Sequence, residues 1–143
     1  MTPHQAQLVR TTFAQIEPFA DHVATLFYDR LFEIAPEVRP LFKRDMDQQG
    51  MKLMQTIGVA VAHLDNLGAV IPSIQALGKR HAGYGVRPEH YATVGAALLW
   101  TLEKGLGDDF TPAVKEAWTE VYHALAATMQ EAAYGQPATQ GAA

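Results

Sequence analysis

His81 is the residue whose type and surroundings most suggest chemistry. Ile74, Leu77 and Gly78 precede it at helical spacing, so its imidazole lies on the apolar side of a predicted helix. A buried imidazole needs a partner, because an unsatisfied polar group costs roughly 1–3 kcal/mol. The residues alone leave two interpretations open: a core histidine bonded to a backbone carbonyl, or a neutral imidazole that ligates a metal ion.

A second possible ligand pair is Glu120 and His123, which form a Glu-x-x-His step. Helical di-iron proteins use two such steps together with two further inward-facing glutamates. Only one copy of the step occurs in this chain, which favours a solvated helix face. The sequence also contains no Gly-rich phosphate loop and no Gly-x-Ser-x-Gly turn, so neither nucleotide binding nor a serine nucleophile is indicated.

Composition narrows the classes of protein further. The chain has 143 residues, 48% of them hydrophobic and 18% charged, which is typical of one globular domain. The absence of cysteine excludes disulfides, iron–sulfur clusters, thiolate zinc sites and covalent Cys-x-x-Cys-His haem attachment. A net charge of −4 argues against nucleic acid as a partner. With no apolar run of about 20 residues and no signal peptide at Met1, we expect no membrane span and a cytoplasmic location.

The elements that position these residues are predicted to be helices throughout, because apolar residues recur at three- and four-residue spacing and no alternating strand is found. Prolines and capping residues set the expected limits. The expected helices begin at Thr2-Pro3, at Pro18 (ending at Pro36), at Pro36 (a short turn to Leu41), at an Asp47 cap, at Val70 (ending at Tyr84), at Pro88 and at Thr111-Pro112. This pattern predicts an all-α fold of six or seven helices, with one domain at 1–135 and a flexible tail at 136–143.

Several other segments bear on the interpretation of His81 through their residue types and their order along the chain. A proline that starts a short helix is followed six residues later by Phe42, and Tyr28 lies in the helix before them. The stretch 77–86 contains His81, and the runs 90–95 and 118–122 come after it in order. In residue types and spacing these segments resemble bacterial single-domain globins and the haem domain of flavohaemoglobins, over roughly residues 4–134.

The resemblance implies a globin fold that holds haem b (iron protoporphyrin IX) without a covalent bond, with His81 as the proximal ligand of the iron. On the distal side it implies Tyr28 and also Gln49, which shares a helix face with Leu53. The candidates for the apolar wall of the haem pocket are Phe42, Leu53, Ile57, Val86 and Leu98.

In such a pocket Tyr28 and Gln49 could each donate a hydrogen bond to bound dioxygen, worth on the order of 1 kcal/mol. Two alternatives stay open: Tyr28 as a core tyrosine bonded to a carbonyl, and Gln49 as a solvent-facing residue. His63 lies fourteen residues beyond Gln49, too far along the helix to ligate the iron. A bis-histidine resting state is therefore not expected.

One feature departs from the family pattern. In flavohaemoglobins and their single-domain relatives, a tyrosine and a glutamate both bond to the proximal histidine. Tyr91 matches the tyrosine, but Ala133 stands where the glutamate is expected, fifteen residues beyond Trp118. Glu131 is two residues away and should point elsewhere. We therefore expect a less anionic imidazole and weak peroxidase-like chemistry.

The expected function is reversible binding of dioxygen and related gases, nitric oxide and carbon monoxide, as a carrier or scavenger. The alternative is a nitric oxide dioxygenase, which would depend on a separate reductase, because no flavin or nicotinamide domain comes after the last predicted helix. A third class, a helical interaction module without a cofactor, would be recognised by its lack of a haem absorption spectrum.

Overall fold

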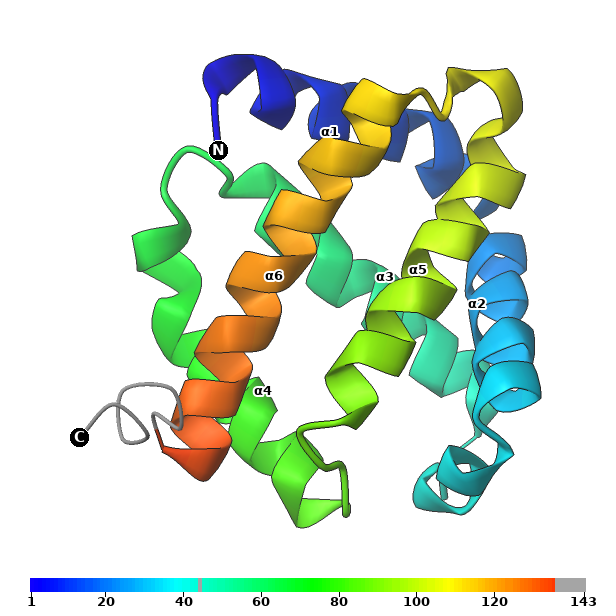
Figure 1. Cartoon of the computed structure of the whole chain (residues 1–143), viewed down its shortest axis with the longest axis vertical. Helices are drawn as coiled ribbons and strands as arrows, with labels where there is room; N and C mark the ends of the chain where they lie inside the picture. Colours follow the sequence, from blue (N-terminus) through cyan, green and yellow to red (C-terminus); the bar gives the residue numbers. More distant parts are fainter. Residues whose placement is uncertain (44, 136–143) are drawn as a thin grey trace.

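The computed structural model describes residues 1–43 and 45–135, and the predicted tail at 136–143 lies outside these residues. The described part is built of helices joined by short turns and contains no strand, which confirms the all-α prediction (Figure 1). The α-helices are α1 (Pro3–Ile16), α2 (Ala20–Ile34), α3 (Met46–Ala62), α4 (Ile71–Gly83), α5 (His90–Leu106) and α6 (Pro112–Tyr134), and the short 3-10 helices are η1 (Glu17–Phe19), η2 (Pro36–Leu41), η3 (Leu67–Val70) and η4 (Gly107–Asp109). None of the described helices is long and apolar enough to cross a membrane.

Capping residues begin several of these helices where the sequence predicts. Thr2 and Gln5 form a complete capping box at α1, and the Thr111 hydroxyl accepts from the Val114 amide at 3.2 Å at the start of α6. The third long helix is capped by Asp45 instead of Asp47: the Asp45 carboxylate accepts from the Asp47 amide at 3.0 Å. Pro18 lies in η1, so the second helix proper starts at Ala20.

The first cluster of the hydrophobic core packs α1 against α6. Val9, Phe13 and Trp118 are buried together with residues of α3 and α5. The indole Nε1 of Trp118 donates to the Thr12 hydroxyl at 2.9 Å, which satisfies both buried polar groups. Ile34 lies on the apolar face that the helical spacing predicts, but it is 39% exposed because it belongs to the last turn of α2, where the chain leaves the core.

A second cluster lies between α2, η2 and α5. Its buried members are Phe27, Tyr28, Leu31, Ala35, Val38 and Ala97, and half-buried apolar residues surround them. Figure 1 places α2 and α4 on opposite sides of the molecule, so the elements that carry Tyr28 and His81 are separated by the interior.

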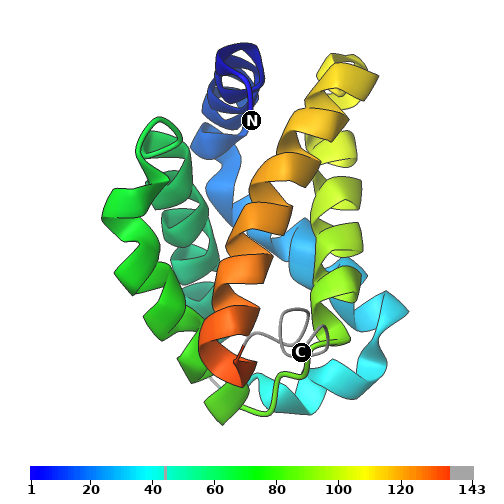
Figure 2. The same cartoon turned by 60° about the vertical axis from the view of Figure 1, so that its left-hand side comes forward.

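Two glycines set how closely helices approach. A Cβ atom at Gly78 would lie 2.7 Å from the Met129 Cα atom, so α4 and α6 meet backbone to backbone. A Cβ atom at Gly50 would lie 2.8 Å from the Ala24 Cβ atom, where α3 crosses α2. Figure 2 shows the lower half of α6 alongside α4. Among the described residues, α4 packs chiefly on α6, whereas α3 packs on α1 and α2.

Candidate functional site

His81 lies near the end of α4, where Ile74 and Gly78 are buried and Lys79 and Arg80 are exposed, as the helical spacing predicts. The imidazole is half-buried, and its Nδ1 lies 2.8 Å from the Leu77 carbonyl oxygen. Because a carbonyl only accepts, this contact puts the ring proton on Nδ1 and leaves the Nε2 lone pair free to bind a metal ion.

Burial also sets the charge of His81. It lowers the pKa of the imidazole below 6.5, the Leu77 carbonyl partly opposes this shift, and the neighbouring Arg80 charge lowers the pKa further. The ring is therefore neutral at pH 7, which is the form that coordinates iron.

Tyr28 is 7% exposed and belongs to an aromatic group. Its ring lies 5.4 Å from Phe42 and 5.9 Å from Phe32, centroid to centroid. Burial raises the pKa of Tyr28 to about 12, and an interaction with the Gln49 side chain partly offsets that rise. The structure thus brings the two predicted distal residues together, with the phenol protonated at pH 7 and able to donate.

The predicted wall residues divide between the two core clusters. Phe42 and Leu53 pack around the buried group that contains Tyr28, Ile57 packs against the first cluster, and Leu98 packs against both. All four side chains are only half-buried. They therefore present apolar surface that a flat apolar group could cover, as a haem would.

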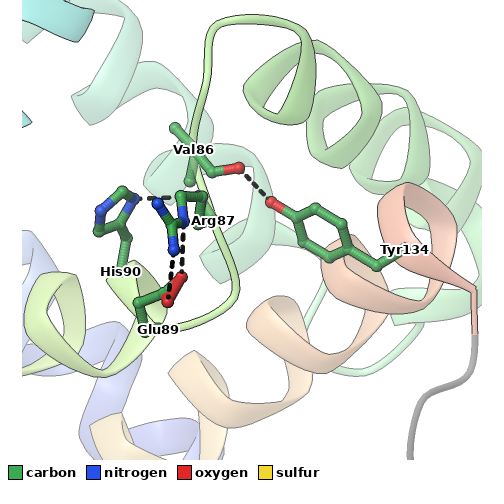
Figure 3. Close-up of polar contacts among 5 residues, drawn as sticks. All are labelled: Val86, Arg87, Glu89, His90 and Tyr134. Carbon is green, nitrogen blue, oxygen red and sulfur yellow. Dashed lines mark hydrogen bonds and ion pairs between the residues drawn. The ribbon is translucent and has the colours of Figure 1, made fainter.

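Val86 belongs to neither cluster and lies in the connection between α4 and α5. Its amide donates to the His81 carbonyl oxygen at 3.0 Å, which ties it directly to the candidate ligand. Its own carbonyl accepts from the Tyr134 phenol at the end of α6 (Figure 3). The contacts that place Val86 in this site are thus two backbone hydrogen bonds.

The proximal side departs from the expected family arrangement. The Tyr91 hydroxyl is buried and has no hydrogen-bond partner among the described residues, so the expected bond to His81 is not formed. His81 Nδ1 instead faces the Leu77 carbonyl oxygen, and Ala133 offers no carboxylate acceptor. Glu131 is exposed, in line with its expected direction away from the site.

Two further tyrosines at this end of the molecule are not among the predicted site residues. The Tyr122 hydroxyl donates to the Tyr91 backbone carbonyl at 2.5 Å, and Tyr134 binds Val86. Tyr134 directly follows Ala133, but a phenol does not match the carboxylate that the family pattern places there. The signal that could have identified Tyr134 is its place in the last turn of α6, directly before the glycine cap Gly135.

The other candidate groups do not assemble a site. Glu120 and His123 are both exposed. Across residues 1–43 and 45–135, no three His, Cys, Asp or Glu side chains gather closely enough to hold a metal ion. A cavity of about 500 Å³ borders Tyr28, between α2 and the first turns of α3, and Asp21, Asp29 and Arg39 are among its lining residues.

The chemistry of the donor set therefore fits an iron porphyrin. A neutral imidazole with a free Nε2, an apolar wall and two distal hydrogen-bond donors are the groups that such a cofactor uses.

The comparisons with known proteins agree with the resemblance to globins. The globin family profile matches residues 25–129. A flavohemoprotein of Bacillus subtilis is 31% identical over 123 residues, which cover 84% of this chain and 31% of that protein.

A flavohemoprotein of Vibrio cholerae is likewise 31% identical, over 88% of this chain and 33% of its own length. The chain thus spans about a third of the length of these curated relatives. Among solved structures, an engineered carbene transferase made from RmaNOD, a candidate nitric oxide dioxygenase of Rhodothermus marinus, superposes with a TM-score of 0.86. It is 27% identical, and the match covers 99% of both chains. By sequence profile, curated relatives and architecture, this chain belongs to the globin family.

Proposed function

We propose that the protein binds haem through His81 Nε2 and reversibly binds dioxygen and other diatomic gases at the ferrous iron. One observation carries this proposal: the Leu77 carbonyl holds the Nδ1–H of a half-buried, neutral His81, which leaves Nε2 as an iron ligand. Since the chain has no cysteine, the cofactor would be non-covalent haem b. When bound, ferrous haem would supply the iron atom to which a diatomic gas ligand binds.

The surrounding residues would select and retain the ligand. Tyr28 and Gln49 would donate hydrogen bonds to the partial negative charge of bound dioxygen, which slows its release. The apolar side chains of Phe42, Leu53 and Leu98 would keep water away from the ferrous iron, because water assists its oxidation.

The test is a haem titration followed by absorption spectra of the ferric, ferrous and oxygenated forms. Wild-type protein should give a strong Soret band and a reversible oxygenated spectrum. His81→Ala should lose most haem affinity, or regain a wild-type spectrum when imidazole is added. His63→Ala is the matched control, since His63 makes the same kind of Nδ1 contact, at 2.9 Å to the Val59 carbonyl, on another helix. An unchanged ferrous spectrum in His81→Ala would remove the axial assignment.

A second candidate is nitric oxide dioxygenation. The structural match to the RmaNOD-derived enzyme over 99% of both chains favours it, because the same pocket could serve both roles. This activity needs an electron for every turnover, so a reductase would be the required partner. The two functions share the oxygen-binding step and differ in the fate of the bound oxygen, which is either released unchanged or transferred to nitric oxide.

A further inference from the structure

The helix α6 contacts the His81 segment at two places, one on each side of the histidine. Three residues before His81, Gly78 meets the backbone of α6, since a Cβ atom there would lie 2.7 Å from Met129 Cα. Five residues after it, the Val86 carbonyl accepts from the Tyr134 phenol in the last turn of the same helix. Because α6 is one continuous helix from Pro112 to Tyr134, both contacts belong to one rigid element.

The second contact reaches His81 through a short chain of hydrogen bonds. Val86 donates its amide to the His81 carbonyl at 3.0 Å while its carbonyl receives the Tyr134 hydroxyl. Gly85, next to it, adopts a φ of +99°, a conformation that glycine tolerates and that turns the chain back towards α4. Further along the connection, the Arg87 amide donates to His90 Nδ1 at 3.0 Å, and Arg87 pairs with Glu89 (Figure 3).

We propose that Tyr134 is a positioning residue for the proximal ligand: by holding Val86, its phenol keeps the end of α4 and the His81 ring in one orientation towards the iron. The inference rests on the proposed function. It gives the last turn of α6 a role in orienting His81. Ala133, in the same turn, cannot fill this role because it has no carboxylate. Burial raises the pKa of Tyr134, so the phenol remains a donor at neutral pH.

The experiment compares Tyr134→Phe with Tyr84→Phe in the haem-loaded protein. Tyr134→Phe keeps the ring and removes the donor. Tyr84 is the matched control, because it is 50% exposed while its ring centroid lies 6.3 Å from that of His81. Three quantities are measured: the iron–histidine stretching band of the ferrous form, the rate of haem transfer to apomyoglobin, and amide hydrogen exchange at Val86 and its neighbours, also in haem-free protein.

In Tyr134→Phe, exchange at the α4–α5 connection should be faster by roughly five- to tenfold, the effect of one lost hydrogen bond. The iron–histidine band should shift or broaden, and haem loss should accelerate by a similar factor. Tyr84→Phe should change none of the three. Faster exchange with an unchanged band and unchanged haem loss would overturn the positioning role, as would three unchanged quantities. A wild-type protein that takes up no haem would overturn this inference together with the proposed function.

Discussion

At the scale of single residues, burial acts on the two sides of the proposed iron site in complementary ways. It lowers the pKa of His81 and raises the pKa of Tyr28, so each side chain is neutral at pH 7. On the proximal side a neutral ring offers a lone pair, and on the distal side a neutral phenol offers a proton. Removal from water thus keeps His81 in the neutral form that can bind iron and keeps Tyr28 in the protonated form that can donate a hydrogen bond.

The distal assignment predicts oxygen dissociation rates. Tyr28→Phe should release oxygen about tenfold faster, which corresponds to about 1.4 kcal/mol, and Gln49→Val should have a smaller effect. The double variant should fall short of the product of the two, because the two side chains interact with each other. Gln55→Val, at an exposed site on the same helix, is the control for stopped-flow measurements. Wild-type rates in both distal variants would contradict the assignment.

The buried phenols predict an alkaline limit to stability. The pKa of Tyr28 rises from 10.0 in the free residue to about 12 in the folded chain, so the folded state holds its proton more tightly. Its contribution is complete below pH 10 and is lost as pH rises towards 12, at a cost of roughly 2–3 kcal/mol. Urea unfolding between pH 8 and 12 should show this decline, and Tyr28→Phe should make it shallower. Equal slopes for wild type and variant would contradict the predicted shift.

At the scale of elements, local chemistry made most helix limits predictable. The starts of α1 and α6 depend on contacts within one helical turn, so adjacent residues are enough to predict them. The residues concerned are the caps Thr2 and Thr111 and the first-turn prolines Pro3 and Pro112. The cap at Asp45 could not be separated from one at Asp47, since both residues are aspartates two positions apart and an aspartate at either position can cap a helix. The Tyr134–Val86 bond joins residues 48 apart and depends on how α6 packs on α4, which no local pattern reports.

The packing of α4 on α6 predicts opposite effects for two glycine substitutions in one helix. Gly78→Ala places a Cβ atom against the Met129 backbone and should destabilise the fold by about 1–3 kcal/mol, because neither backbone can yield without moving a helix. Gly83→Ala meets nothing within 4 Å and should stabilise it by about 0.5–1 kcal/mol through the gain in helix propensity. Thermal unfolding of both variants checks the pair. Equal melting temperatures would show that the close approach carries no cost.

At the scale of the whole molecule, the fold gathers residues from α2, α3 and η2 on one side and from α4 and α6 on the other. The sequence predicts which residues belong to each side, because the order of the segments resembles that of globins. It does not predict which wall residues share a cluster: Ile57 packs apart from Phe42 and Leu53. That division depends on where helices cross, for example at Gly50 and Ala24.

The choice between carrier and enzyme is decided by the state of the iron after one nitric oxide molecule reacts. Ferrous iron, dioxygen and nitric oxide give ferric iron and nitrate, so one electron must return for each further cycle. We predict that the oxygenated protein consumes one nitric oxide per haem and then stops until a reductant or a reductase is added. A nitric oxide electrode and absorption spectra monitor both steps. Rapid multiple turnover with NADH alone, in protein free of reductase, would contradict this prediction.

The hydrogen bond between Thr12 and Trp118 has a consequence for the order of folding. It joins residues 106 apart, and Val9 and Phe13 of α1 have Trp118 among their core neighbours. During synthesis α1 is made before α6, so the part of its apolar face that Trp118 covers stays open until most of α6 has left the ribosome. Closing so large a loop is slower than forming any helix, so this step should limit the folding rate. The fluorescence of Trp118, recorded in Trp100→Phe, would report that closure as it happens.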